Sequence, residues 1–234
     1  MMIMDSFTHD SSDTKNAFLH RVRQATVKGR SFRVTTPDSF PDQLAYVGAS
    51  PSPLHCIKRE LELVGAQVYC LSGKTEVQDC MNQVLEKRAP QSVLSWTHPV
   101  LEKYEIRSLL HEQHVTLCSP DDQNTDRRFN AEMGISSVDW AIAETGSLIV
   151  CSKPEQPTDV SLLPPVHLAL VEETQILPDI FDLFTLLESQ ELPSNLGFIT
   201  GPSKTGDIEL KLTTGVHGPK ELLVFLIESS PSSP

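Results

Sequence analysis

The sequence predicts an α/β protein: a three-layer α/β/α domain with a mostly parallel sheet, preceded by an N-terminal helical arm. Between residues 53 and 118, amphipathic stretches with a helical period alternate with short β-prone runs. Strands that alternate with helices in this way form a parallel sheet covered on both faces. The chain has 234 residues, of which 39% are hydrophobic, enough for one large domain with a sizeable core.

The chain divides into four predicted parts. Residues 1–13 and 229–234 are polar and lack any period, so we expect both ends to be disordered. Residues 14–52 form the arm, an amphipathic helix up to about residue 27 followed by a connecting loop that contains prolines. Residues 53–228 form the α/β domain.

Three helix and strand pairs open this domain. We expect helices at 55–64, 75–87 and 99–110, and strands at 66–71, 92–96 and 114–118. Sheets of this kind gather ligands at the carboxyl ends of their strands. The polar loop 119–131 that follows is long enough to have a function of its own.

The second half of the domain contains further strands and two predicted helix starts near polar motifs. Ser136 and Asp139 have the spacing of a capping box, which predicts a short helix there, and Gly146 supplies a turn before strand 147–151. Pro178 opens a helix rich enough in apolar residues to be deeply packed. Another helix is expected after Thr205. The remaining predicted strands are 166–171, 196–200 and 221–227.

The charge of the chain excludes several partners. There are 31 acidic and 19 basic residues, a net charge of -12. Nucleic acid and anionic membrane surfaces would be repelled at long range. No stretch approaches eighteen apolar residues in a row, and no basic flank of a signal peptide precedes Asp5, so we expect a cytoplasmic protein.

The cysteines predict that this chain holds no cofactor of its own. There are five, and no two have C-x-x-C spacing. Such a set is unsuited to an iron–sulfur cluster, a structural zinc or a disulfide framework. Cys151 lacks a nearby histidine in the sequence, which argues against a nucleophile.

Glu144 is the candidate acid or base. Apolar residues precede it and a β-prone run follows it, so its carboxylate should leave bulk water beside the turn at Thr145 and Gly146. A carboxylate so placed either accepts hydrogen bonds as a structural partner or works as an acid or base. Asp139 and Thr145 are the residues that could orient it.

A second candidate element follows strand 196–200, where the sequence reads Gly-Pro-Ser-Lys-Thr. A helix start beside a lysine binds anions, so Ser203, Lys204 and Thr205 could hold a carboxylate or phosphate oxygen. The spacing is not that of a Walker A loop, and a capped helix with Lys204 in water is an equal alternative. Together with Asp207, His217 and Glu144, we expect these residues to line a single cleft.

Two histidines have plainer interpretations. His167 lies within a predicted strand, where a core histidine with a satisfied ring is the usual case, and His217 in its glycine-rich loop favours a loop-capping contact. A metal shared by this pair with Glu144 or Asp207 is the weaker alternative, so no metal site is expected.

Three motifs resemble the lactate-utilisation protein C family of LUD-domain proteins: GISSVDWAIAETGSLIV, LLPPVHLALV and ITGPSKTGDIELKLTTGVHGPKELLVFLI. The resemblance implies a fold like that of ribose-phosphate isomerase and CoA transferases. It also implies a role beside iron–sulfur partner subunits in oxidising L-lactate to pyruvate. Family members usually carry Arg where this chain has Lys204, so the charge is kept but a two-pronged grip on an oxyanion is lost.

Three functions remain open from the sequence. The first is a non-redox LUD-domain subunit of a lactate-oxidising system. The second is a stand-alone enzyme on the CoA-transferase or sugar-phosphate isomerase type of fold, with Glu144 as nucleophile or base. The third is a module that binds a small carboxylate or phosphorylated ligand.

Overall fold

The computed structural model describes residues 10–29, 52–118, 125–205, 213–214 and 217–229. The chain divides into two units, residues 1–46 and 47–234, and each is described by itself. In the first unit, α1 (Asp10–Gly29) begins earlier than the predicted helix at residue 14. Its described part exposes Phe18, Leu19 and Val22. Every other helix and strand belongs to the second unit.

A six-stranded parallel sheet forms the centre of the second unit, in the order β1-β12-β7-β4-β2-β3. Its strands are β1 (Gln67–Ser72), β2 (Ser92–Ser95), β3 (Thr116–Cys118), β4 (Met133–Ser136), β7 (Val166–Glu172) and β12 (Glu221–Glu228). The interior residues of β7 and β12 are buried throughout, as expected for strands covered on both faces. The predicted α/β class with a mostly parallel sheet is confirmed.

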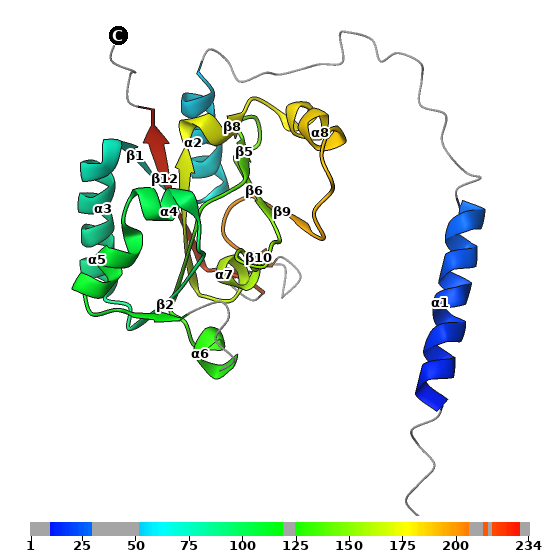
Figure 1. Ribbon diagram of the computed structural model, residues 1–234. Helices are drawn as coiled ribbons and strands as arrows, with labels where there is room; N and C mark the ends of the chain where they lie inside the picture. The colour runs from blue at the N-terminus through cyan, green and yellow to red at the C-terminus, as the bar shows by residue number, and fades with distance from the viewer. Residues whose placement is uncertain (1–9, 30–51, 119–124, 206–212, 215–216, 230–234) are drawn as a thin grey trace, which may run out of the picture. The chain divides into compact units, whose positions relative to one another are not determined.

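Helices cover both sides of this sheet. Figure 1 shows α3 and α5 along one side, and α2 with a second sheet along the other. The helices are α2 (Pro53–Val64), α3 (Gly73–Arg88), α4 (Pro99–Lys103), α5 (Ile106–Glu112), α6 (Thr125–Phe129), α7 (Asp159–Leu162) and α8 (Ile180–Glu188). In the described part of the chain, none of the helices has the length and apolar character that crossing a membrane requires.

Local sequence explains where α2 and α3 begin and end. Ser52 accepts a hydrogen bond from the His55 N–H, and Pro53 stands in the first turn, where its missing N–H has no cost. Gly65 ends α2 with φ 98°, a conformation that glycine adopts without strain. The chain then enters β1 directly, and Ser72 leads from β1 into α3.

The predicted helix 99–110 is two helices, because Glu105 adopts a left-handed conformation with φ 55° between α4 and α5. Its carboxylate pairs with Lys74 at 2.7 Å and accepts from Gln78 at 3.1 Å, which offsets part of the backbone strain.

A second, four-stranded sheet has the order β8-β5-β6-β9. Its strands are β5 (Trp140–Ile142), β6 (Ser147–Cys151), β8 (Ile176–Leu177) and β9 (Leu196–Ile199), and β8 follows the short 3-10 helix η2 (Glu173–Gln175). The helix predicted at Ser136 and Asp139 is wrong. Ser136 ends β4, and Asp139 instead ties β5 to β6 by accepting from the Cys151 N–H at 2.7 Å.

The helix predicted after Thr205 falls on residues 206–212, which lie outside the described residues. Thr205 lies in β10 (Lys204–Thr205), which pairs antiparallel with β11 (Thr213–Thr214).

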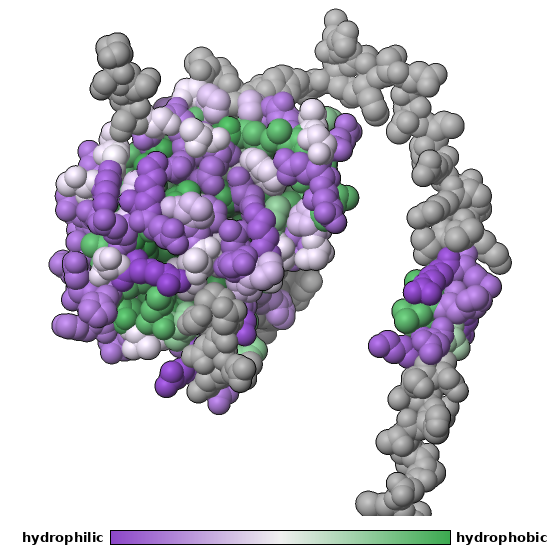
Figure 2. All heavy atoms as spheres, in the orientation of Figure 1, coloured by the Kyte–Doolittle hydropathy of each residue, from purple (hydrophilic) through white to green (hydrophobic). Residues whose placement is uncertain are grey.

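The apolar helix predicted after Pro178 forms as α8, but it is not deeply packed. Leu183 and Leu187 are buried, whereas Phe181 is 62% exposed and Phe184 49% exposed. Elsewhere on this unit, the face in Figure 2 is mostly hydrophilic, with hydrophobic residues in separate small areas.

Candidate functional site

A candidate site lies at the carboxyl ends of three neighbouring strands, β1, β12 and β7. Register brings these ends together, since Ser72 pairs with Glu228 and Ile227 with Glu172. A pocket of about 430 Å³ opens there. We call it the carboxyl-edge pocket; it is lined by Gly73, Lys74, Lys103, Tyr104, Glu172, Thr174, Ile227, Glu228 and Ser229. Ligands of parallel α/β sheets characteristically bind at this edge.

One wall of the carboxyl-edge pocket is the start of α3. Gly73 has φ 74°, and a Cβ placed on it would meet nothing within 4 Å, so the backbone here is open to a ligand. Ser72 makes no side-chain cap, and its N–H donates to the Glu76 carboxylate at 2.7 Å. The first turn of a sixteen-residue helix therefore faces the pocket with its positive dipole end.

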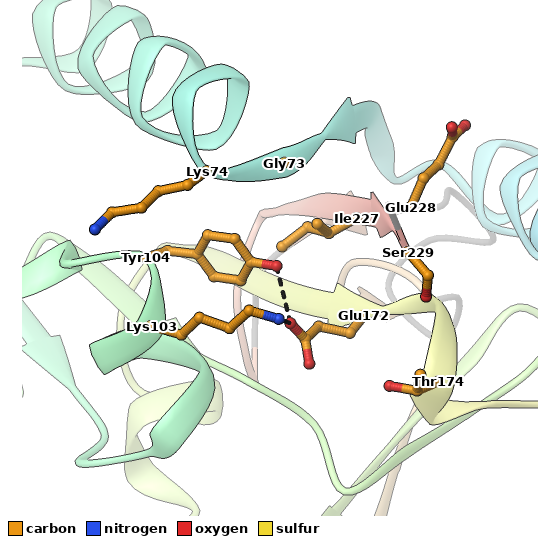
Figure 3. A pocket seen from close by; sticks show the side chains of 9 residues that line it. All are labelled: Gly73, Lys74, Lys103, Tyr104, Glu172, Thr174, Ile227, Glu228 and Ser229. Carbon is orange, nitrogen blue, oxygen red and sulfur yellow. Dashed lines mark hydrogen bonds and ion pairs between the residues drawn. The ribbon is translucent and has the colours of Figure 1, made fainter. Parts of the chain in front are cut away.

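The opposite wall carries a carboxylate held by two donors. The Lys103 ammonium lies 2.6 Å and the Tyr104 hydroxyl 2.8 Å from the same oxygen, Oε1 of Glu172. Figure 3 shows the two side chains converging on Glu172, while Lys74 extends away from it toward the rim. The Glu172 carboxylate also accepts from the Gln175 backbone N–H, which fixes its position at the end of β7.

The contact with Glu172 changes the acid–base properties of both donors. Burial, and then the hydrogen bond to Glu172, raise the pKa of Tyr104. The hydrogen bond to Glu172 raises the pKa of Lys103. Lysine is therefore charged and tyrosine protonated at neutral pH, and both groups present protons to whatever lies beside Glu172.

His98 and Asp139 lie near this same edge. His98 Nδ1 accepts from the Val100 N–H at 3.2 Å and begins α4. Burial lowers the pKa of His98, while the charges of Asp139 and Glu172 act in the opposite direction. Asp139 itself is engaged, because Lys153 lies 2.5 Å from its Oδ1 and the Cys151 N–H donates to its Oδ2. The predicted catalytic residue Asp139 does not line the pocket, and its carboxylate holds the end of β6.

The composition of the carboxyl-edge pocket suits a small oxyanion. Lys74 and Lys103 oppose Glu172 and Glu228, so the four charged side chains of its lining cancel. The start of α3 adds a positive dipole end, part of which the Glu76 carboxylate offsets by accepting from the Ser72 N–H. The pair of Glu172 and Tyr104 can accept and donate a proton, as acid–base chemistry at a hydroxyl or carbonyl group requires.

Glu144 and Thr145 lie elsewhere, in the turn between β5 and β6 that packs against α2. The Ala143 carbonyl accepts from Cys56 Sγ at 3.4 Å, and a Cβ on Gly146 would be 2.7 Å from the α2 backbone. Glu144 is largely buried, and its N–H donates to the Pro178 carbonyl at 3.1 Å. Neither residue lines the carboxyl-edge pocket, and a catalytic role for Glu144 stays a prediction.

Hydroxyl groups connect this turn to the third motif, which begins at Ile199. Thr145 Oγ1 lies 2.7 Å from Ser147 Oγ, which lies 2.7 Å from Thr200 Oγ1. The pairing of β6 with β9 brings these residues together, since Leu148 stands opposite Ile199. Two of the sequence motifs are therefore neighbours in the second sheet.

The predicted anion-binding residues separate in the structure. Ser203 and His217 line a smaller cavity of about 210 Å³ at the amino ends of β7 and β12. The Lys204 ammonium donates to the Val64 carbonyl at 2.5 Å, which places its charge at the end of α2. Thr205 lies in β10, and Asp207 lies outside the described residues. One cleft for all of them stays a prediction.

The family model described as LUD domain matches residues 54–227, three quarters of the chain. The chain belongs to the LUD domain family. Its relatives include two proteins named Lactate utilization protein C. The one from Geobacillus thermodenitrificans is 26% identical over 239 residues, covering 94% of this chain and 98% of that protein. The one from Bacillus subtilis (strain 168) is 26% identical over 244 residues, covering 94% and 98%.

A solved structure supports the fold of this LUD domain. A DUF162 family protein from Deinococcus radiodurans superimposes with a TM-score of 0.54 and 18% identity, covering 75% of this chain and 96% of that one. At this level of identity the likeness concerns the fold alone.

The sequence motifs of the LUD domain did not reveal the residues of the carboxyl-edge pocket. Lys103 and Tyr104 lie inside the predicted helix 99–110, and Glu172 directly follows the predicted strand 166–171, without a distinctive pattern. One signal was available: strand 67–72 runs straight into Gly73-Lys74-Thr75 and a helix, the arrangement of an anion-binding turn. The strand end and the glycine were predicted, but the ligand site was not.

The described cysteines of this LUD domain stand in five different elements: Cys56 (α2), Cys70 (β1), Cys80 (α3), Cys118 (β3) and Cys151 (β6). Burial raises the pKa of the Cys151 thiol to about 11, which makes it a poor nucleophile. Within the described residues, no three His, Cys, Asp or Glu side chains gather in a way that could hold a metal ion.

Proposed function

We propose that this LUD-domain chain acts in lactate utilisation, as a subunit that binds the small acid during the oxidation of L-lactate to pyruvate. The observation that carries the proposal is the match to two proteins named Lactate utilization protein C along 94% of the chain. The carboxyl-edge pocket is the proposed binding site for the 2-hydroxy or 2-oxo acid.

The pocket fits this ligand class in size and chemistry. A three-carbon acid fits readily into about 430 Å³. Its carboxylate would accept from the N–H groups at the start of α3, next to Gly73. Its 2-hydroxyl or 2-oxo group would then face Tyr104 and Glu172, which can donate and accept a proton.

The electrons are proposed to leave through partner subunits that carry iron–sulfur clusters. Oxidation of lactate to pyruvate releases two electrons and two protons, so an electron carrier has to be present. The placement of the five cysteines in five separate elements supports a division of labour in which this chain is the non-redox subunit.

Affinity purification of the tagged full-length chain from native extract is expected to recover proteins rich in C-x-x-C motifs that show iron–sulfur absorption. The matched control is an unrelated tagged protein of similar acidity. Recovery of the chain without any such subunit, in extract from lactate-grown cells, would contradict the partnership and favour a free-standing anion-binding module.

Two substitutions in the carboxyl-edge pocket are expected to change lactate affinity in opposite directions. Glu172→Gln removes a negative charge and releases Lys103 and Tyr104, so lactate should bind more tightly, by about threefold to tenfold. Lys103→Met removes a positive charge and should weaken binding by about tenfold. Lys58→Met, at an exposed pair on α2, is the control and should leave binding unchanged.

Titration calorimetry with L-lactate and pyruvate measures these changes. An equal loss of affinity in Glu172→Gln and Lys103→Met would show that Glu172 only holds the side chains of the pocket wall in position. Unchanged affinity in both variants would remove the carboxyl-edge pocket as the binding site, even if partner subunits co-purify.

A further inference from the structure

A second cavity lies at the opposite, amino edge of the central sheet. We call it the amino-edge cavity; it has a volume of about 210 Å³ and is lined by Ser161, Leu162, His167, Phe198, Ile199, Gly201, Pro202, Ser203, His217, Gly218, Pro219 and Leu222. The Ser203 N–H donates to the Pro219 carbonyl at 2.9 Å, so the two loops at its mouth are tied together. Residues from two of the three sequence motifs meet here, since Leu162 and His167 belong to the second motif and Ile199 and Ser203 to the third.

His167 forms the floor of this cavity and is fully buried. In the sheet it stands between Gly134 of β4 and Leu222 of β12. Its Nε2 lies 2.8 Å from Ser136 Oγ, while Nδ1 is buried and has no hydrogen-bond partner among the described residues. Burial lowers the pKa of His167 to about 4, so the ring is neutral at pH 7. A buried polar atom left without a partner is uncommon, because it forfeits its hydrogen bond to water.

The contact with Ser136 indicates which ring nitrogen carries the proton. The His167 ring is the acceptor that the described residues offer the Ser136 hydroxyl. If Nε2–H donated to Ser136, the hydroxyl proton would in turn be left without an acceptor. Ser136 therefore donates to Nε2, and Nδ1 carries the proton. The cavity is thus lined by a histidine whose Nδ1–H has no acceptor among the described residues.

The rest of the lining favours an acceptor with negative charge. None of its twelve residues is acidic, although the whole chain carries a net charge of -12. Ser203 adds a hydroxyl and His217 a second imidazole, and leucine, isoleucine, phenylalanine and proline side chains form apolar walls. The cavity can therefore accommodate a ligand that has a polar end and an apolar chain.

We propose that the amino-edge cavity binds a small monocarboxylate with an apolar chain, whose carboxylate accepts a hydrogen bond from His167 Nδ1–H. This site is separate from the carboxyl-edge pocket. His167 and Glu172 are five residues apart on β7, which corresponds to roughly 16 Å along the strand. The proposal does not depend on the proposed role in lactate utilisation.

The test uses the full-length protein with ¹⁵N-labelled histidine, and propionate as the probe. The imidazole nitrogen signals of His167 should report a proton on Nδ1, and propionate should shift them. 1-Propanol, which has the same chain and no charge, should not. The shift should persist in Lys103→Met, because that substitution lies in the other pocket. These titrations need no variant at His167 itself.

Two substitutions of His167 then separate its two nitrogens. Glutamine places an amide near the position of Nε2 and can keep the contact with Ser136, whereas asparagine places an amide near the position of Nδ1. His167→Gln should bind propionate about tenfold more weakly, and His167→Asn should stay within about threefold of the unsubstituted protein. Ser203→Ala, at the mouth, should weaken binding by about threefold.

Several results would overturn the proposal. These are an unprotonated Nδ1, His167 signals that do not move with propionate, equal shifts with 1-propanol, or a shift that disappears in Lys103→Met. Loss of propionate binding in His167→Asn with retention in His167→Gln would also reject it, because that pattern would assign the effect to the bond with Ser136.

Discussion

Gly134→Ala is expected to destabilise the protein by about 3 kcal/mol, at the upper end of what overpacking a core costs. A Cβ at this position would lie 1.9 Å from the Val160 carbonyl oxygen of α7. β4 cannot move aside, because it is hydrogen-bonded between β2 and β7. The added methyl group therefore has to push α7 outward, and with it Ser161 and Leu162 of the amino-edge cavity.

Urea unfolding followed by circular dichroism measures this loss, with Gly73→Ala as the matched control. A Cβ at Gly73 meets no atom within 4 Å, so that variant carries only the strain of a positive φ, about 1 to 2 kcal/mol. If Gly134→Ala were no less stable than Gly73→Ala, the close approach of α7 to β4 would be wrong.

His167 is expected to make the protein acid-sensitive. In the unfolded chain its ring takes up a proton near the ordinary pKa of 6.5, whereas in the folded protein burial lowers the pKa to about 4. Between these values the unfolded state binds more protons, so stability falls as the pH falls. As far as His167 is concerned, the free energy of unfolding has its full value above pH 6.5. It is lower by about 3 kcal/mol at pH 4.

The measurement compares unfolding free energies of the unsubstituted protein and His167→Gln across this pH range. Carboxylates such as Glu221, whose pKa is lowered by its hydrogen bond to Arg88, titrate in both proteins and cancel in the difference. The difference between the two proteins should change by about 3 kcal/mol. Two parallel stability curves would mean that His167 is accessible to protons in the folded state.

Much of the fold could be predicted because local pattern and tertiary environment agree. The apolar runs of β7 and β12 are buried on both faces, and α2 and α3 have clear apolar positions and, for α2, clear start and stop residues. In contrast, the S-x-x-D spacing at Ser136 and Asp139 predicted a helix that the sheet pairings override. The helix expected after Thr205 lies outside the described residues, and Lys204 and Thr205 themselves pair with β11.

The candidate site was harder to predict because it depends on strand order. β12, the last strand in the sequence, lies between β1 and β7, and this insertion brings Glu228 beside Gly73 and Glu172. No local sequence pattern predicts this order of strands. Glu144 and Lys204 had stronger sequence signals, yet the structure places both against α2. There Lys204 donates to the Val64 carbonyl, and the turn that carries Glu144 packs on the α2 backbone at Gly146.

A crystal structure of the protein grown with millimolar L-lactate tests the proposed binding site most directly. We expect lactate in the carboxyl-edge pocket, with its carboxylate within hydrogen-bond distance of the N–H groups that begin α3 and its hydroxyl beside Tyr104 and Glu172. Lactate bound elsewhere in the domain, with this pocket accessible in the crystal and filled only by water, would contradict the account.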